Sequence, residues 1–153
     1  QSLASAARNQ GPNAYASNSH FVFELIQNAE DANFEPGVKP WIGFELSEDA
    51  VHVAINEVGF SFNDMDKLCS MSKSSKRDGE LKIGNKGIGF KSVFKVTAAP
   101  AIYSNDYRVK FDIENDRNGF SKPIWNDACP PEVSLPKCRT HYVLPLLRGL
   151  RGK

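Results

Sequence analysis

The fold of this chain depends most on the stretch Phe-Glu-Leu-Ile-Gln-Asn-Ala-Glu-Asp-Ala, residues 23–32. Within it, Glu24, Asn28 and Asp31 stand at positions i, i+4 and i+7, which share one face of a helix with about 3.6 residues per turn. We therefore expect a helix over residues 19–33 with a polar stripe along one side. The residues expected on the opposite, core-facing side are Val22, Leu25, Ile26 and Ala29.

This polar stripe has two interpretations. Many surface helices carry Glu and Asn on a solvated face, and the spacing alone fits that ordinary role. Asn is a mediocre helix former, however, and Asn28 stands in the middle of the helix. Its side-chain carbonyl oxygen suits Mg²⁺, which takes few protein ligands and keeps phosphate and water in its shell. Glu24, one turn earlier, would then hold and deprotonate a water aimed at a phosphate.

Residues 84–92 form a glycine-rich stretch, Gly-Asn-Lys-Gly-Ile-Gly-Phe-Lys-Ser. Gly84, Gly87 and Gly89 admit positive φ and a close approach of ligand to backbone, and residues 90–96 have helical periodicity. Such a turn presents backbone N–H groups at a helix N-terminus, a natural phosphate site, although a purely structural glycine turn fits equally well. No apolar strand leads directly into it, as a Rossmann motif requires, and no G-K-[ST] follows, as a Walker motif requires.

Together these motifs resemble the Bergerat ATP-binding fold of the GHKL group, which includes gyrase, the ninety-kilodalton heat-shock chaperone, histidine kinases and the MutL mismatch-repair proteins. Within that group the chain most resembles the sacsin-like and NO VEIN-like proteins. The similar stretches follow the family's order, at residues 19–32, 56–60, 83–96 and, more loosely, 140–146. The resemblance implies a two-layer α/β (α+β) sandwich with a mixed sheet covered on one face by helices. ATP or ADP with Mg²⁺ would lie between the helices and the sheet.

The resemblance also assigns roles to matching residues. Glu24 corresponds to the general base for attack by water, Asn28 to the Mg²⁺ ligand and Asp31 to a residue beside the nucleotide. Thr140, on a late strand, corresponds to a contact with the adenine edge. The other residues expected at the cofactor are Asn56, Gly59, Gly84, Lys86, Gly87, Ile88, Gly89, Phe90 and Lys91. Histidine kinases of this group usually carry Asn where Glu24 stands, so Glu24 favours the ATP-hydrolysing branches.

The second motif departs from the usual family pattern. The family normally offers an Asp followed by two glycines, and the Asp accepts a hydrogen bond from the adenine amino group. Here the motif contains Asn56 and a single glycine, Gly59. An Asn carbonyl accepts the same kind of hydrogen bond, so we expect Asn56 to contact the adenine.

Alternation of apolar and polar residues predicts two hairpins and a returning strand. The hairpins are expected over residues 41–55 and 101–113, and the returning strand over residues 141–147. A short helix is expected over residues 63–70. The side chains expected to point inward from the first strand are Ile42, Phe44 and Leu46, and those expected to anchor packing are Trp41 and Trp125.

The chain is expected to divide into three regions. Residues 1–17 are expected to be a mobile lead-in, residues 18–148 the ATP-binding domain, and residues 149–153 a basic tail at which a longer protein is truncated. Residues 71–85 are rich in Ser, Lys and Gly, and form either a mobile lid over the phosphates or a solvated loop. Lys91, after the last glycine, either brings a point charge to a phosphate or is an ordinary solvated lysine.

Composition narrows the class of protein. The 153 residues are 41% hydrophobic and 24% charged, which suits one globular domain with a core. The net charge is +1 and no stretch approaches the ~20 apolar residues of a membrane span, so neither nucleic acid nor a membrane is an indicated partner. Cys69, Cys129 and Cys138 form no C-x-x-C pair, and without a signal peptide they predict free thiols in an intracellular protein of the cytoplasm or nucleus. His52 and His141 lie in strand patterns without ligand partners, so neither is expected to bind a metal.

The sequence thus predicts a Mg²⁺-dependent ATP-binding domain whose slow hydrolysis drives conformational change in a larger chaperone-like or regulatory protein. Two alternatives remain open. One is a non-catalytic interaction module in which nucleotide only orders the lid and a partner surface. The other is an ATPase of the chromatin or DNA-repair kind. The expected partners are ATP, other domains of a longer chain and an unidentified protein client.

Overall fold

A computed structural model of the chain describes residues 12–69 and 89–151, with side chains from residue 19 onward. The first element is helix α2, Pro12–Glu30, which both begins and ends earlier than the helix expected over residues 19–33. Proline suits a first helical position because its missing N–H would have no intrahelical acceptor there. The early end of the helix leaves Asp31 beyond its last turn.

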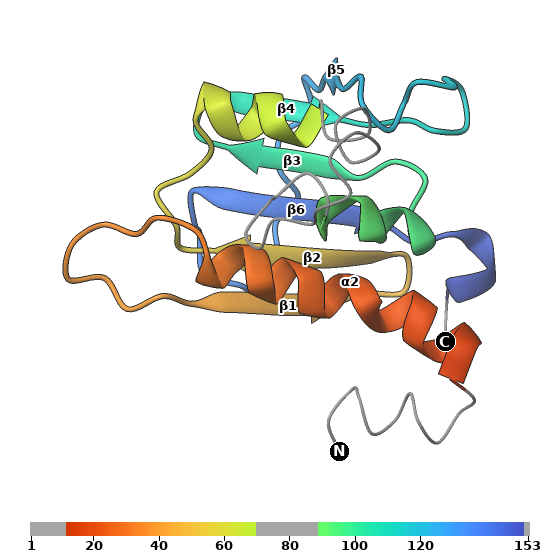
Figure 1. The fold of residues 1–153 in the computed structure, drawn as a ribbon, viewed down its shortest axis with the longest axis horizontal. Helices are drawn as coiled ribbons and strands as arrows, with labels where there is room; N and C mark the ends of the chain where they lie inside the picture. Colours follow the sequence, from red (N-terminus) through yellow and green to blue (C-terminus); the bar gives the residue numbers. More distant parts are fainter. Residues whose placement is uncertain (1–11, 70–88, 152–153) are drawn as a thin grey trace, which may run out of the picture.

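The described strands form one six-stranded sheet in the order β1-β2-β6-β3-β4-β5 (Figure 1). The strands are β1 Ile42–Leu46, β2 Ala50–Ile55, β3 Ala101–Ser104, β4 Tyr107–Lys110, β5 Ile124–Trp125 and β6 Thr140–Pro145. Every neighbouring pair runs antiparallel, so the expectation of a mixed sheet is wrong. The reason is the position of β6, which enters between β2 and β3 and opposes both of them.

The predicted hairpins and the predicted returning strand are confirmed. β1 pairs with β2, and β3 pairs with β4 across a turn at Asn105, whose φ is 52°. Asn visits this left-handed region more readily than most residues. A helix over residues 62–69 matches the expected short helix, and a further helical segment over residues 89–95 contains the 3-10 helix η1, Lys91–Lys95. Strand β5 was not predicted because two residues are too few to carry a periodic pattern.

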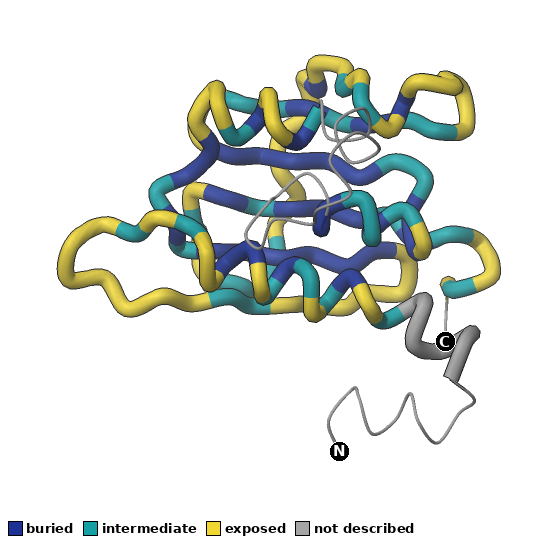
Figure 2. Tube along the Cα trace, viewed as in Figure 1, coloured by how far each residue is buried: buried dark blue, intermediate teal, exposed yellow. Residues whose placement is uncertain are grey.

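The helices cover one face of the sheet, and the main core lies between the two layers (Figures 1 and 2). The register pairs Val53 with Tyr142 and Tyr142 with Ile102, so these three side chains share the helix-facing side. Leu25 of α2 and Phe90 of the 89–95 segment pack into the same cluster and are 0% and 1% exposed. The architecture is mixed α/β with helices on one face, as expected.

Apolar side chains near the edges of the sheet are more exposed than expected (Figure 2). Phe44 and Leu46 of β1 pair with the core residues Val53 and Val51, so they lie on the expected inward face, but they are 36% and 66% exposed. β1 is an edge strand with a neighbour on one side only, and its side chains lie at the margin of the core. Trp41 and Trp125 are 38% and 57% exposed and do not serve as buried packing anchors.

The buried face of α2 is rotated from the expected one. Its buried side chains are Phe21, Leu25, Asn28 and Ala29. Val22 and Ile26, which were expected in the core, are only partly buried. Asn28 was expected opposite the core but is 5% exposed, because this part of the polar stripe faces the 89–95 segment and not solvent.

Candidate functional site

The two sequence motifs meet where α2 faces the start of the 89–95 segment. A Cβ atom placed on Gly89 would lie 2.7 Å from Glu24 Oε2 and 3.3 Å from Asn28 Oδ1. The first distance is too short for a real Cβ atom, so the absence of a side chain at Gly89 permits this approach. Residues far apart in the sequence thus bring a carboxylate, an amide carbonyl and a bare backbone to one place.

Glu24 is held by a neighbour on its own helix. His20 Nε2 lies 3.0 Å from Glu24 Oε1, and the two side chains are 59% and 32% exposed. One carboxylate oxygen therefore contacts the imidazole while the other faces Gly89. His20 was not among the expected site residues, and its i, i+4 spacing to Glu24 is the sequence signal that identifies it.

Asn28 is buried at the centre of this arrangement. Burial of an amide side chain costs free energy unless its polar atoms have hydrogen-bond or metal partners. The burial of Asn28 therefore indicates that its polar atoms have such a role. No group of three or more His, Cys, Asp or Glu side chains within residues 12–69 and 89–151 is arranged to hold a metal ion. A Mg²⁺ ion that binds mainly phosphate and water needs only one such protein oxygen, so Asn28 fits the expected ligand.

Asp31 is not brought to the same place. It follows the last turn of α2 and is exposed, and its Oδ2 accepts a hydrogen bond from Gln27 Nε2 at 3.0 Å. The i+7 spacing would have placed it on the stripe of Glu24 and Asn28 only if the helix had continued. Its expected place beside the nucleotide stays a prediction.

Asn56, the residue expected to contact adenine, is engaged elsewhere. Its Oδ1 accepts a hydrogen bond from Trp41 N at 2.7 Å, and its Nδ2 donates to Lys39 O at 2.9 Å. Both ends of the amide therefore bind the backbone that leads into β1. In this conformation Asn56 supports the hairpin, and its expected contact with adenine stays a prediction.

Glu57, the next residue, is the buried carboxylate of this motif, at 4% exposed. Burial of Tyr142, followed by the negative charges of Glu57 and Asp64, holds the pKa of Tyr142 well above its usual value. Tyr142 lies in the core between the layers, and Glu57 is close enough for its charge to act on the Tyr142 hydroxyl. Sequence reasoning missed Glu57, although it is an acidic residue like the Asp that the family carries in this motif.

The loop that carries Glu57 is fastened to the β3–β4 turn. Asn105 Nδ2 donates to Val58 O at 3.1 Å and to Phe60 O at 3.2 Å. Gly59, between them, has a φ of 93°, and a Cβ there would lie 2.3 Å from Asn105 Nδ2. The described contacts of Gly59 thus explain its identity by backbone conformation and by the approach of Asn105.

Thr140 stands fully buried at the start of β6. Its Oγ1 lies 2.7 Å from Ser104 Oγ, which also accepts a hydrogen bond from Phe60 N at 2.7 Å. These bonds join the loop after β2 to the centre of the sheet. A hydroxyl has one proton and two lone pairs, so the Thr140 hydroxyl keeps capacity to bond beyond its contact with Ser104.

Phe90 and Lys91 lie in an aromatic part of the core. The ring of Phe90 is 5.5 Å from that of Phe111, centroid to centroid. Lys91 Nζ donates to the carbonyl of Phe120 and lies 5.8 Å from the Phe111 ring centroid. Burial lowers the pKa of Lys91, and the charge of Cys69 opposes this effect. To meet a phosphate, the ammonium would have to leave these partners.

Several expected residues cannot be placed. Gly84, Lys86, Gly87 and Ile88 lie outside the described residues, as does the lid expected over residues 71–85. Cys69, Cys129 and Cys138 are free cysteines, as expected.

In this α/β domain with an antiparallel sheet, Glu24, Asn28 and Gly89 come together on the helix-facing side, and the carboxylate of Glu57 is buried in the loop after β2. The family model of the Sacsin domain matches residues 44–119. The chain is 42% identical over 109 residues to Protein NO VEIN of Arabidopsis thaliana, an alignment that covers 71% of this chain. It is 32% identical over 136 residues to Sacsin of Homo sapiens, and that alignment covers 76% of this chain. The similarity to sacsin-like and NO VEIN-like proteins is thus confirmed.

The chain is a small part of the length of these relatives. It spans 4% of Protein NO VEIN and 3% of Sacsin. Among the helices of the described residues, none is long and apolar enough to cross a membrane.

Proposed function

We propose that this domain, with a Bergerat-type site, binds ATP with Mg²⁺ and hydrolyses it slowly, driving conformational change in a larger protein. The observation that carries the proposal is the convergence of Glu24 and Asn28 on Gly89. When water attacks a Mg²⁺-bound phosphate, the reaction uses a proton acceptor, a hard oxygen ligand for the metal and a backbone that the phosphate can approach. Mg²⁺ would neutralise the charge of the phosphates when bound.

Each residue has one role in this proposal. Asn28 Oδ1 is the protein ligand of Mg²⁺, and Glu24 orients a water and takes its proton. Glu57 accepts a hydrogen bond from the adenine amino group, in place of the expected Asn56. The hydroxyl of Thr140 supports the adenine edge from β6. Two observations support these roles. One is the burial of Asn28, Glu57 and Thr140, and the other is that the side chain of Asn56 is hydrogen-bonded to backbone.

Nucleotide binding is tested by thermal unfolding with and without Mg·ADP. A ligand at about 100 times its Kd stabilises the folded state by roughly 2.7 kcal/mol, so the wild type should melt at a higher temperature. Asn28→Ala should lose the dependence on Mg²⁺, whereas Gln27→Ala, its exposed neighbour, should keep it. The absence of any shift at millimolar nucleotide, with a folded sample, would overturn the proposal.

Hydrolysis is tested at Glu24. A general base typically contributes about 10²–10⁴-fold in rate, so Glu24→Ala should lower ATP turnover by that order while nucleotide affinity is kept. Glu30→Ala, an exposed carboxylate on the same helix, is the matched control and should change neither quantity. An equal loss of binding in Glu24→Ala would show that Glu24 has a structural role instead.

One observation favours a second candidate, a nucleotide-gated interaction module without hydrolysis. Glu24 Oε1 is in contact with His20 Nε2 at 3.0 Å, so this oxygen already has a side-chain partner in place of a water. In this case the wild type binds Mg·ADP but shows no turnover. Measurable wild-type turnover that depends on Glu24 would exclude this candidate.

A further inference from the structure

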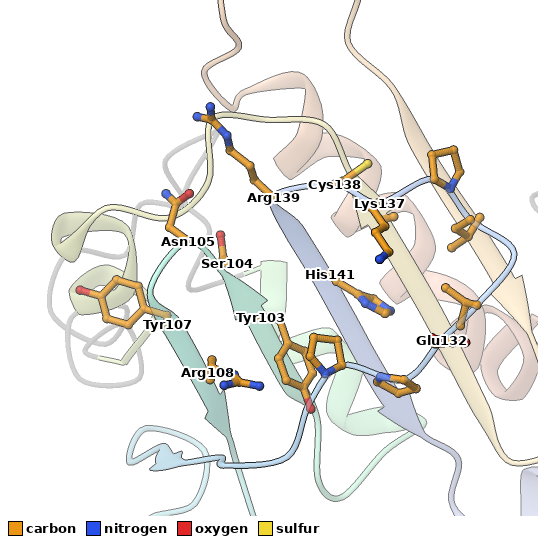
Figure 3. A pocket seen from close by; sticks show the side chains of 16 residues that line it. Tyr103, Ser104, Asn105, Tyr107, Arg108, Glu132, Lys137, Cys138, Arg139 and His141 are labelled. Carbon is orange, nitrogen blue, oxygen red and sulfur yellow. The ribbon is translucent and has the colours of Figure 1, made fainter.

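A cavity of about 840 Å³ lies on the face of the sheet away from the helices, under residues 130–139 (Figure 3). None of the residues assigned to the ATP site lines it, although Ser104, which does, lies 2.7 Å from Thr140 Oγ1. Its volume lies within the range of about 300–1,000 Å³ that small-molecule sites occupy. It is therefore a separate feature from the nucleotide site proposed above.

The floor of this cavity is a row of polar side chains across three strands. The register pairs His141 of β6 with Tyr103 of β3, and Tyr103 with Arg108 of β4. The His141 and Tyr103 rings are 6.1 Å apart, centroid to centroid. The other apolar cluster on this face is small and consists of Ala101, Tyr103 and Val143. A face that served only for packing would carry apolar side chains in place of this row.

Two imidazoles on this face of the sheet, His141 in the cavity lining and its neighbour His52, each have one buried nitrogen without a described partner. Within residues 12–69 and 89–151, His141 Nε2 and His52 Nδ1 are buried without a hydrogen-bond partner. His52 is 7% exposed, and its ring lies 5.7 Å from that of His141, centroid to centroid. Burial and the neighbouring His52 lower the pKa of His141, so near neutral pH its ring has one N–H to donate. A buried polar atom without a partner is costly, and a ligand oxygen at this place would relieve that cost.

Two positively charged side chains, Arg108 and Lys137, line the same cavity. Arg108 is held by a hydrogen bond from Nη2 to Ala128 O at 3.1 Å, which leaves other N–H groups of its guanidinium as donors. Lys137 comes from the segment above the floor, and Figure 3 shows its ammonium extending toward His141. Glu132 is the acidic residue of the lining, against these two cations. Arg139 also lines the cavity, but it pairs with Glu35 at 3.1 Å and Figure 3 shows it directed away.

The hydroxyl of Tyr103 completes the donor set. It accepts a hydrogen bond from Asn126 Nδ2 at 2.9 Å, so its own O–H is available to donate. Above the floor, Pro130, Pro131 and Leu135 provide apolar surface. The cavity thus joins a cationic, donor-rich floor to an apolar cover.

We propose that this cavity binds a small organic oxyanion, with a carboxylate or phosphate group held by Arg108, Lys137 and His141. The apolar body of the ligand packs against Tyr103 and the proline-rich cover. Charge-assisted hydrogen bonds from a guanidinium are the strongest contacts that such an anion makes. The cavity lies on the opposite face of the sheet from Glu24, Asn28 and Gly89, so this proposal does not depend on the proposed ATP site.

The test uses the histidine resonances of the whole chain, since its three histidines report on both faces. Phenyl phosphate, benzoate and neutral benzyl alcohol are titrated while the imidazole signals are followed by NMR. We expect saturable shifts of His52 and His141 with an anion and little change at His20, which lies beside Glu24. Benzyl alcohol should bind far more weakly. The stronger of the two anions identifies phosphate or carboxylate as the preferred group.

Substitutions make the test specific. Lys137→Gln changes an exposed side chain and should weaken anion binding about tenfold without loss of folding, as expected for one charged contact. Arg108→Gln should weaken it at least as much, and Lys122→Gln, an exposed lysine elsewhere, should not weaken it. Mg·ADP should not displace the anion. No shift of His141 at millimolar anion, a shift of His20 alone, or equal affinity in Lys137→Gln would each overturn the proposal.

Discussion

Gly89 is the residue at which the proposed catalytic geometry is most sensitive to a single methyl group. Gly89→Ala would place a Cβ 2.7 Å from Glu24 Oε2, and the end of a flexible side chain gives way more easily than backbone. The carboxylate should therefore move, while folding stability changes by less than about 1 kcal/mol, since alanine also favours the helix. A misplacement of about 1 Å costs about 10²-fold in rate, so ATP turnover should fall by that order.

The matched control for this substitution is Gly149→Ala, because no atom lies within 4 Å of a Cβ placed at Gly149. Its turnover and its melting temperature should equal those of the wild type. Full turnover in Gly89→Ala would show that Glu24 does not depend on the close approach. A large loss of stability in Gly89→Ala would show instead that Glu24 is fixed too firmly to move.

His141 determines part of the pH dependence of stability. Its pKa in the folded state lies below the ordinary value of about 6.5, first through burial and then through His52. As the pH falls, the unfolded chain takes up this proton first, so the contribution is complete above about pH 6.5 and is lost below it. Urea unfolding at pH 7.5 and pH 5.5 should therefore show a smaller loss of stability in His141→Gln than in the wild type.

The comparison variant is His20→Gln, because the His20 side chain that it replaces is 59% exposed. It should lose stability between the two pH values as the wild type does. Carboxylates also titrate in this range, but they are common to all three proteins and cancel in the comparison. An identical pH dependence in His141→Gln would mean that burial on this face has little effect on His141.

At the scale of elements, the central and edge strands should respond differently to one substitution. Leu144 of β6 is 0% exposed and Leu46 of β1 is 66% exposed. Leu144→Ala removes fully buried methyl groups and should cost about 2–5 kcal/mol of the free energy of unfolding. Leu46→Ala lies at the margin of the core and should change it by less than about 0.5 kcal/mol. Urea unfolding measures both, and similar losses would mean that β1 is not a true edge.

Elements whose pattern is local were predictable, and those that depend on distant contacts were not. Both hairpins follow from alternation within a few residues, and they were predicted from the sequence. The insertion of β6 between β2 and β3 depends on pairing between distant segments, so the sheet was wrongly expected to be mixed. The burial of Phe44 was overestimated for the same reason, because alternation shows a face but not whether a neighbour covers it.

At the scale of the whole molecule, the candidate site was predictable where chemistry and spacing agree. Glu24, Asn28 and Gly89 were singled out for their chemical character, and the structure brings these three together. Glu57 was missed because its burial depends on the loop being fastened by Asn105, which lies far along the chain. The cavity under residues 130–139 also required the three-dimensional arrangement, because several strands line it.

Strand β6 has a consequence for how this domain tolerates genetic change. Thr140 and His141 are consecutive, yet one faces the helix layer and the other the cavity on the opposite face. Loss of one codon within β6 would shift the alternation by one residue and send each following side chain to the wrong face. Loss of one codon within residues 130–136 would only shorten a connecting segment. In-frame deletion libraries should therefore be depleted within residues 140–145 and populated just before them.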